Sequence, residues 1–199
     1  GMPGMPGRYW NNIAISQADL LIGIGMRFDD RVTGKISEFA TGAKIIHIDI
    51  DPTAIGKNVP VDVPVVGDAK SVLHEVNKLV KRQKRTVWRK HVDNLKEKFP
   101  LTFETVEGGP IKPQEAIVTL SEEVGEDAIY TTEVGQHQMW AAQFLQLSFP
   151  RQFISSGGLG TMGFGFPAAI GAALARPDKL VIDVAGDGSF QMVLQELAT

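Results

Sequence analysis

Residues 181–190 read Val-Ile-Asp-Val-Ala-Gly-Asp-Gly-Ser-Phe, an apolar, β-branched run that stops at a Gly-Asp-Gly-Ser turn. A helix-like pattern continues directly from Phe190 to Ala198. The order predicts a buried strand, a tight turn and a helix. Backbone N–H groups at a helix start bind phosphate, and an adjacent Asp can hold the metal that bridges phosphates. We interpret the turn as a site for Mg²⁺ and a diphosphate, although Gly and Asp also serve turn geometry alone.

The sequence on either side repeats this alternation. Helical patterns over 113–124 and after 137 flank a predicted strand over 127–132, which ends at Glu133-Val-Gly-Gln-His137. A second strand over 152–155 leads into Ser156-Gly-Gly-Leu-Gly-Thr-Met-Gly163, and an Ala-rich helix ends near Ala175. Alternation of this kind implies a parallel sheet with right-handed crossovers. The three turns then fall at one edge of the sheet, where one cofactor can touch all of them.

The first part of the chain shows three further strand ends. Asp19–Gly25 predicts a buried parallel strand, 43–50 a second that ends in carboxylates, and 64–66 a third before Gly67-Asp68. An acidic residue at such an end often accepts hydrogen bonds from a nucleotide ribose, or caps the next turn. An intact Gly-x-Gly-x-x-Gly fingerprint is absent, so a standard nicotinamide site is not supported.

Residues 26–34, Met-Arg-Phe-Asp-Asp-Arg-Val-Thr-Gly, follow the first strand. In an extended segment Arg27, Asp29 and Arg31 share one face. They form either a surface ion network or an anion site, because guanidinium groups match phosphate geometry. We expect His47, inside the second strand, to be a packed core histidine rather than a ligand.

A helix is predicted over 69–82, with its inward side formed by Val72, Leu73, Val76, Leu79 and Val80. The basic run from Lys78 to Lys98 predicts a solvated connecting helix rather than a nucleic-acid helix, because Asp93 and Glu97 interrupt it. Residues 99–113, with Gly108-Gly-Pro110, resemble an inter-domain linker. We therefore expect domains at 1–98 and 114–199.

Composition narrows the class of protein. The 199 residues carry a formal net charge of −3, so no strong field indicates nucleic acid or an anionic membrane. No cysteine is present, which excludes disulfides, thiolate metal sites and a cysteine nucleophile. No secretory signal is visible, and the uncharged run over 152–175 is too rich in glycine for a membrane span. The sequence begins with Gly and ends inside a helical pattern, so we expect these residues to be part of a longer polypeptide.

The Gly186-Asp-Gly-Ser189 turn resembles the start of the thiamin diphosphate motif, which begins Gly-Asp-Gly and ends about thirty residues later in a pair of Asn. The match becomes specific because two further motifs fit the same family, Glu133-Val-Gly-Gln-His137 and Gly157-Gly-Leu-Gly-Thr-Met-Gly163. Residues 27–34 narrow the choice of family further. The chain resembles the catalytic large subunit of the acetolactate (acetohydroxyacid) synthase family. The resemblance spans essentially all residues, as a middle FAD-binding domain and the first part of a C-terminal thiamin diphosphate domain. It implies an α/β fold of two parallel-sheet, doubly wound, Rossmann-like domains, the second truncated.

The resemblance also implies roles for individual residues. Asp187 is the expected Mg²⁺ ligand, and Met162 an apolar wedge that keeps the cofactor bent. The other expected contacts of thiamin diphosphate are Gly188 and Ser189, which hold the diphosphate, Val134, Gly135, Gln136 and His137, which line its side, and Gly160 at the aminopyrimidine. The expected FAD contacts are Gly4, Met5, Gly25, Arg27, Asp29, Arg31, Val32, Asp49, Ile50, Gly67, Asp68 and Ala69.

This sequence departs from the family pattern in the loop before the first helix, where Pro6 stands in place of the family's His. The family's second Mg²⁺ ligand, an Asn, belongs after Thr199, and its proton-relay Glu belongs to an N-terminal domain supplied by the partner subunit. We therefore assign no catalytic residue to this chain and expect residues 1–199 alone to be inactive.

The implied activity is condensation of pyruvate with a second 2-keto acid, with loss of CO₂, to acetolactate or acetohydroxybutyrate in branched-chain amino acid biosynthesis. The implied cofactors are thiamin diphosphate, Mg²⁺ and a structural FAD. We expect 2-keto acid substrates, a homodimer or tetramer, a possible small regulatory subunit, no nucleic-acid or membrane partner, and a cytoplasmic or organellar location. The alternatives are pyruvate oxidase, glyoxylate carboligase or a non-catalytic cofactor-binding module.

Overall fold

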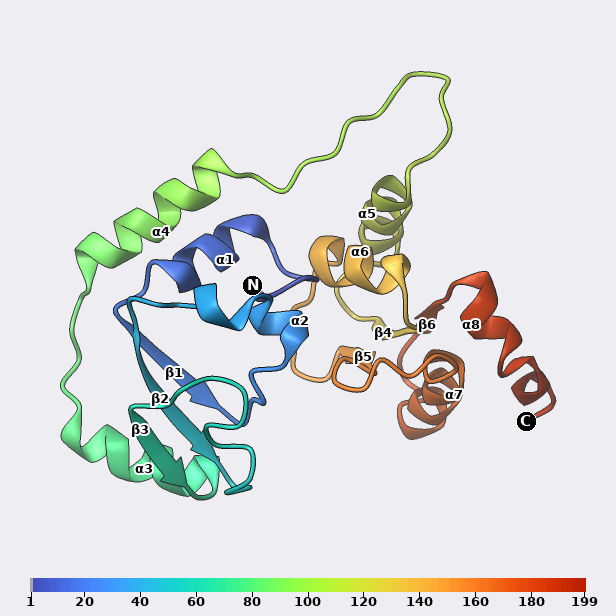
Figure 1. Ribbon diagram of the computed structural model, residues 1–199. Helices are drawn as coiled ribbons and strands as arrows, with labels where there is room; N and C mark the ends of the chain where they lie inside the picture. The colour runs from blue at the N-terminus through green and yellow to red at the C-terminus, as the bar shows by residue number, and fades with distance from the viewer. Residues whose placement is uncertain (1) are drawn as a thin grey trace. The chain divides into compact units, whose positions relative to one another are not determined.

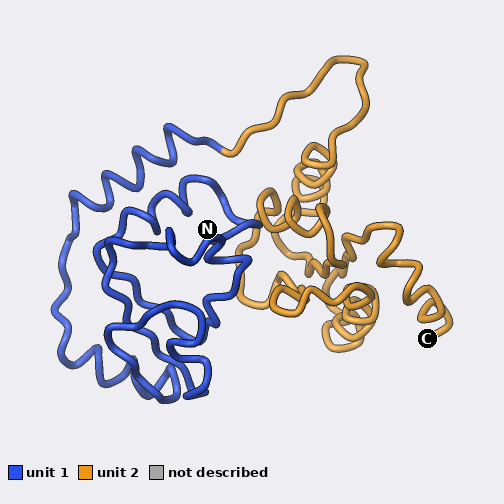
Figure 2. The backbone as a smooth tube through the Cα atoms, in the orientation of Figure 1, with its two compact units in different colours: residues 1–100 blue, residues 101–199 orange. Residues whose placement is uncertain are grey.

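A computed structural model describes residues 2–199, and the chain divides into two compact units, residues 1–100 and 101–199 (Figure 2). Each unit contains one three-stranded sheet within the described residues, and each sheet is entirely parallel (Figure 1). The predicted α/β class with two parallel-sheet domains is confirmed. In the part of the chain that the structure describes, no helix is both long and apolar enough to cross a membrane.

The sheet of the first unit has the order β1-β2-β3. Its strands are β1 (Leu20–Ile24), β2 (Lys44–Asp49) and β3 (Val63–Val66). Phe28, Ile45 and Val59 form a buried cluster beside it. His47 is 1% exposed, and its Nε2 lies 2.7 Å from the carbonyl oxygen of Met26, so the expectation of a packed core histidine is confirmed.

The sequence-based expectation for strand β1 was wrong. Strand β1 was expected to be buried, yet alternate side chains Leu20, Ile22 and Ile24 are 46%, 51% and 38% exposed. In a strand successive side chains point to opposite faces, and the face that carries these three is only partly covered by the described residues of the unit. The continuous apolar run could not show which face is covered, because both faces carry apolar residues.

The helices of this unit are α1 (Tyr9–Ser16), α2 (Asp30–Thr33), α3 (Ala69–Leu79) and α4 (Thr86–Lys98), with a 3₁₀ turn η1 (Ile36–Glu38). Helix α3 stops three residues before the predicted end at Arg82, because Val80 is extended. Leu79 and Val80, expected to face inward, are 83% and 64% exposed. The basic residues that follow disfavour another turn, since like charges four apart repel on a helix.

The sheet of the second unit has the order β5-β4-β6. Its strands are β4 (Ile129–Thr132), β5 (Phe153–Ser155) and β6 (Val181–Val184). The central strand β4 is fully buried, as expected for a strand paired on both sides. Its Tyr130 packs in a core with Ile117, Ala128, Ala141 and Leu145.

The helices of this unit are α5 (Pro113–Val124), α6 (Gln136–Phe144), α7 (Gly165–Ala175) and α8 (Asp187–Gln191), followed by a 3₁₀ turn η2 (Leu194–Ala198). The helix predicted from Phe190 to Ala198 therefore begins earlier and is broken. Val193 leaves the helical region, with φ −134° and ψ 19°, and separates the two short pieces. Asp187 consequently lies in the first turn of α8.

Candidate cofactor sites

The carboxyl edge of the second sheet gathers the three turns that the sequence singled out. Thr132 at the end of β4 pairs with Ser155 on β5 and with Val184 on β6, so the three strands end level. The chain runs from β4 to β5 on one side, and β6 lies on the other side of β4. Open parallel sheets bind ligands at such a reversal of strand order. The predicted convergence of these turns is confirmed.

The turns after β4 and β6 are in direct contact. A Cβ atom placed on Gly135 would lie 2.8 Å from Cε1 of His137, and one on Gly186 would lie 2.9 Å from the same atom. Ser189, 2% exposed, donates its hydroxyl to the carbonyl oxygen of Val134 at 3.2 Å. With glycine at both positions the backbones of the two turns approach the imidazole closely, and a Cβ atom at either position would force the ring to shift.

The imidazole of His137 is partly buried between the two turns. Its Nε2 is buried and has no hydrogen-bond partner among residues 2–199. Burial lowers the pKa of His137, and the nearby carboxylates of Glu133 and Asp183 act in the opposite direction. A ring in this state can donate or accept a hydrogen bond at the cofactor edge, depending on its tautomer.

Asp187 and Gly188 lie at the open rim of this edge, and both are exposed. Met162, 43% exposed, reaches the same place, because its Cε is 3.7 Å from the position of a Cβ on Gly188. Gly160, with φ +63°, lies near Val134, whose Cγ1 is 3.8 Å from a Cβ placed on that glycine. The structure thus brings the residues expected to bind thiamin diphosphate together in one place.

Two carboxylates near this edge received no role from the sequence: Glu133, which is fully buried, and Asp183, which is partly buried. Glu133 is 0% exposed, and its Oε2 and Oε1 accept the backbone N–H groups of Gly163 at 2.6 Å and Phe166 at 3.0 Å. Asp183 accepts the hydroxyl of Thr131 at 2.8 Å. Burial raises the pKa of Asp183; the Thr131 hydrogen bond opposes this, and the charge of Glu133 adds to it. The signal available in the sequence was an acidic residue inside or directly after an apolar strand.

The carboxyl edge of the first sheet collects the residues expected to bind FAD. The N–H group of Gly25 donates to Ile48 at 2.9 Å, and that of Gly67 donates to Asp49 at 2.9 Å, so these strand ends also lie level. Asp68 caps α3 by accepting the backbone N–H of Ser71 at 2.9 Å, and this contact lowers the pKa of Asp68. Ala69 is the first residue of α3, and Ile50 is 73% exposed.

Residues 27–33 do not stay extended, which corrects the expected common face of Arg27, Asp29 and Arg31. Asp29 caps α2 by accepting the N–H of Val32 at 3.2 Å, and Arg31 lies within that helix. The guanidinium of Arg27 lies 3.2 Å from the Asp29 carboxylate. The side chains of Arg27 and Arg31 are 52% and 64% exposed, so both cations are open to solvent near the sheet edge.

The loop before α1 is tied to α2. Met5 donates its N–H to the carbonyl oxygen of Arg31 at 2.8 Å. Asn12 on α1 holds Gly4 from both sides: its Oδ1 accepts the glycine N–H at 2.8 Å, and its Nδ2 donates to the glycine carbonyl at 2.9 Å. A Cβ on Gly4 would lie 2.2 Å from that same Arg31 oxygen. Asn12 is a positioning residue that sequence reasoning missed; the paired Asn11-Asn12 was its only signal.

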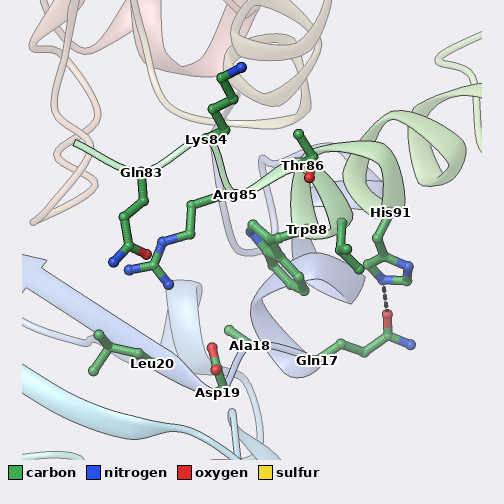
Figure 3. A pocket seen from close by; sticks show the side chains of 11 residues that line it. Gln17, Ala18, Asp19, Leu20, Gln83, Lys84, Arg85, Thr86, Trp88 and His91 are labelled. Atoms are coloured by element: carbon green, nitrogen blue, oxygen red, sulfur yellow. Dashed lines mark hydrogen bonds between the residues drawn. The ribbon is translucent and has the colours of Figure 1, made fainter. Parts of the chain in front are cut away.

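A cavity of about 880 Å³ lies elsewhere on the first unit (Figure 3). It is lined by residues 17–20 and 83–88 together with His91, whose Nε2 lies 2.8 Å from the side-chain oxygen of Gln17. Asp19 and Leu20 stand at the amino end of β1, whereas the residues expected to bind FAD stand at the carboxyl edge. The cavity is therefore separate from the residues expected to bind FAD.

Comparison with known proteins identifies the family of the chain that carries these sites. Residues 133–199 match the model "Thiamine pyrophosphate enzyme, C-terminal TPP binding domain", and residues 1–76 match "Thiamine pyrophosphate enzyme, central domain". The chain belongs to the thiamine pyrophosphate enzymes. The matched C-terminal segment begins at Glu133, the first residue after β4, and includes all three turns of the second sheet.

Within the thiamine pyrophosphate enzymes, the chain is similar along its whole length to acetolactate synthases. It is 53% identical to the chloroplastic acetolactate synthase of Arabidopsis thaliana, 52% to the large subunit of Corynebacterium glutamicum and 49% to the enzyme of Mycobacterium leprae. Each alignment covers 100% of this chain but only 30%, 33% and 33% of those proteins. The chain thus spans about a third of the length of these relatives.

Proposed function

We propose that this chain forms part of an enzyme that condenses pyruvate with a second 2-keto acid, with loss of CO₂, to acetolactate or acetohydroxybutyrate. The observation that carries the proposal is the convergence of the glycine-rich turns with Asp187 and Met162 at one sheet edge. The names of the full-length relatives support the same reaction. Their chloroplastic and bacterial origins make a cytoplasmic or organellar location part of the proposal.

The residues at this edge fit thiamin diphosphate and Mg²⁺. No group of three or more His, Cys, Asp or Glu side chains within residues 2–199 is arranged to hold a metal ion. Mg²⁺ does not need one, because it commonly takes one or two carboxylates, phosphate oxygens and several waters. An exposed Asp187 beside the accessible backbone of Gly188 matches that requirement. When bound, thiamin diphosphate supplies the carbanion chemistry that amino acid side chains lack.

The chain's own residues then bind and orient this cofactor. Gly188, Ser189 and the turn 134–137 hold the diphosphate, and Asp187 holds the metal. Met162 places an apolar side chain over Gly188, which excludes water from that side of the cofactor. Proper orientation of a reacting centre supplies much of the rate in such a site.

The first unit fits a dinucleotide. Two exposed guanidinium groups, Arg27 and Arg31, stand near the carboxyl edge and suit a pyrophosphate. Asp49 at the end of β2 suits an adenosine ribose. We assign FAD to this edge, with cofactor domains over 1–98 and 114–199 and a linker over 99–113.

The resemblance also leads us to propose an oligomer in which a partner subunit supplies the proton-relay Glu. Residues 1–199 alone are then expected to turn over no pyruvate. Measurable pyruvate consumption by this isolated chain would contradict that expectation.

The test is acetolactate formation from pyruvate by the protein at its natural full length, with Mg²⁺, thiamin diphosphate and FAD. Asp187→Asn removes one carboxylate from the proposed metal site. Asp178→Asn is the matched control, because Asp178 is an exposed acid in the same unit that pairs with Arg176 at 2.7 Å. We expect the product to form in wild type and in the control, and to be lost in Asp187→Asn. Peroxide instead of acetolactate indicates an oxidase; bound cofactors with neither product indicate a carboligase of other specificity or a binding module.

A further inference from the structure

Glu133 connects two segments at the carboxyl edge of the second sheet, the turn after β4 and the segment before α7, to which the proposed function gives separate roles. It directly precedes the turn 134–137, which is assigned to the diphosphate. Its carboxylate accepts the N–H groups of Gly163 at 2.6 Å and Phe166 at 3.0 Å, in a segment thirty residues further along the chain. Gly163 directly follows Met162, so one fully buried side chain ties the diphosphate turn to the segment that carries the apolar wedge.

Helix α7 depends on this contact for its cap. Its N-cap residue, Phe164, makes no side-chain hydrogen bond to the helix start. The first N–H groups of a helix have no partner within the helix, and a negative charge there is favourable. Glu133 supplies both the acceptor and the charge from the neighbouring strand end, so the start of α7 is fixed relative to β4 rather than by its own sequence.

Close packing around Gly165 leaves this junction little freedom. A Cβ on Gly165 would lie 2.5 Å from the backbone nitrogen of Glu133 and 2.6 Å from Oδ1 of Asp183. At the other end of the junction, Met162 lies close to Gly188 and Gly160 lies close to Val134. A shift at the Glu133 contact is therefore passed to Met162 and Gly160.

We propose that Glu133 is a positioning residue for thiamin diphosphate, because it holds the segment 160–166 so that Met162 and Gly160 meet the cofactor. This rests on the proposed function of the same edge. Glu133 contacts no reacting atom; it acts through the segment that it holds.

The test compares two variants of the full-length protein. Glu133→Gln keeps the size of the side chain, but its amide offers one acceptor and turns an N–H₂ group toward the second backbone donor. Gln152→Met is the control: Gln152 is 1% exposed in the same unit and makes hydrogen bonds to Glu126, Ala128 and Ser148. It precedes β5 and lies away from the carboxyl edge.

We expect Glu133→Gln to weaken thiamin diphosphate binding and lower kcat, each by about tenfold, the usual effect of losing one hydrogen bond to a charged group. The KM for pyruvate should stay within about twofold, since the variant changes cofactor orientation rather than substrate contacts. Gln152→Met should lower thermal stability without changing cofactor affinity or kcat. Equal losses in both variants, or unchanged cofactor affinity and kcat in a folded Glu133→Gln, would overturn the proposal.

Hydrogen exchange of the apo protein tests the contact without relying on activity. In wild type the amides of Gly163 and Phe166 should exchange more slowly than that of Leu159, which is 84% exposed. Glu133→Gln should reduce this difference, because it leaves one acceptor for the two backbone donors. Unprotected amides in wild type would refute the positioning role even where Glu133→Gln fails to fold. A wild-type protein that shows the protection but makes no acetolactate would count against the proposed function alone.

Discussion

Two glycines of helix α7 provide a matched pair of substitutions. Gly165 is buried at the start of the helix, and Gly171 is exposed in its interior. Alanine at Gly171 would meet no atom within 4 Å. Alanine at Gly165 would meet the nitrogen of Glu133 at 2.5 Å, the carbonyl carbon of Thr132 at 2.6 Å and Oδ1 of Asp183 at 2.6 Å.

The magnitudes follow from these contacts. In an exposed helix interior, Gly→Ala raises the free energy of unfolding by about 1 kcal/mol, so Gly171→Ala should stabilise the unit. Gly165→Ala gains at most that amount and is opposed by overpacking, which costs about 1–3 kcal/mol or more. Two of its three contacts are backbone atoms at and just after the end of the central strand β4, and these cannot rotate away. We expect Gly165→Ala to be less stable than Gly171→Ala by about 2–3 kcal/mol.

Urea unfolding followed by far-ultraviolet circular dichroism measures the difference. For an m-value of about 3 kcal/mol/M, the midpoints of the two variants should differ by about 1 M. Cofactor binding provides a second measurement, because displacement of α7 at Gly165 also moves the Glu133 contact. A Gly165→Ala protein as stable as Gly171→Ala would show that the α7–β4 junction is looser than these distances indicate.

Three further predictions concern the two sheet edges. Asn12→Leu should weaken FAD binding by about tenfold, because it removes both hydrogen bonds that hold Gly4, and should leave thiamin diphosphate affinity unchanged in calorimetric titrations. Asp183→Asn should raise the melting temperature at pH 8 but little at pH 4. The folded-state pKa of Asp183 is raised, so burial of its charge destabilises the protein as pH rises above the unfolded value of 3.8; equal gains at both pH values would contradict this reasoning. His137→Gln should flatten the loss of stability below pH 6.5, since the lowered pKa of His137 makes the unfolded chain take up the proton first; an unchanged pH profile of thermal unfolding would refute it.

Local patterns were sufficient for the strands and for the position of the turns. Each apolar run that stops at a glycine or an acidic residue is a strand in one of the two parallel sheets, and neighbouring strands end at the same level. The residues at these stops are 25, 49, 67, 133 and 186. Parallel pairing needs covered, apolar strands and crossover helices, and both are visible in a sequence. The Gly-Asp-Gly-Ser turn at 186–189 likewise lies at the junction between a strand and a helix, as its sequence predicted.

The ends of helices and the exposure of side chains were harder to predict from the sequence. Helix α3 ended early, the segment after β6 broke into two short pieces, and β1 kept one apolar face exposed. The arginine and aspartate residues of 27–31 fitted an extended segment by spacing, yet the Asp29 cap made a short helix of them. Each outcome depends on a cap or a covering element that periodicity does not encode.

By itself the sequence determined the α/β class, the order of the strands along the chain, and the glycine and aspartate turns of both edges. Only the tertiary structure decided which side chains support those turns. Glu133 holds residues 163–166, Asn12 holds Gly4, and His137 fits between Gly135 and Gly186. The physical reason is that hydrogen bonds and close contacts between residues far apart in the chain depend on strand register and chain reversal, which no local pattern of residue types specifies.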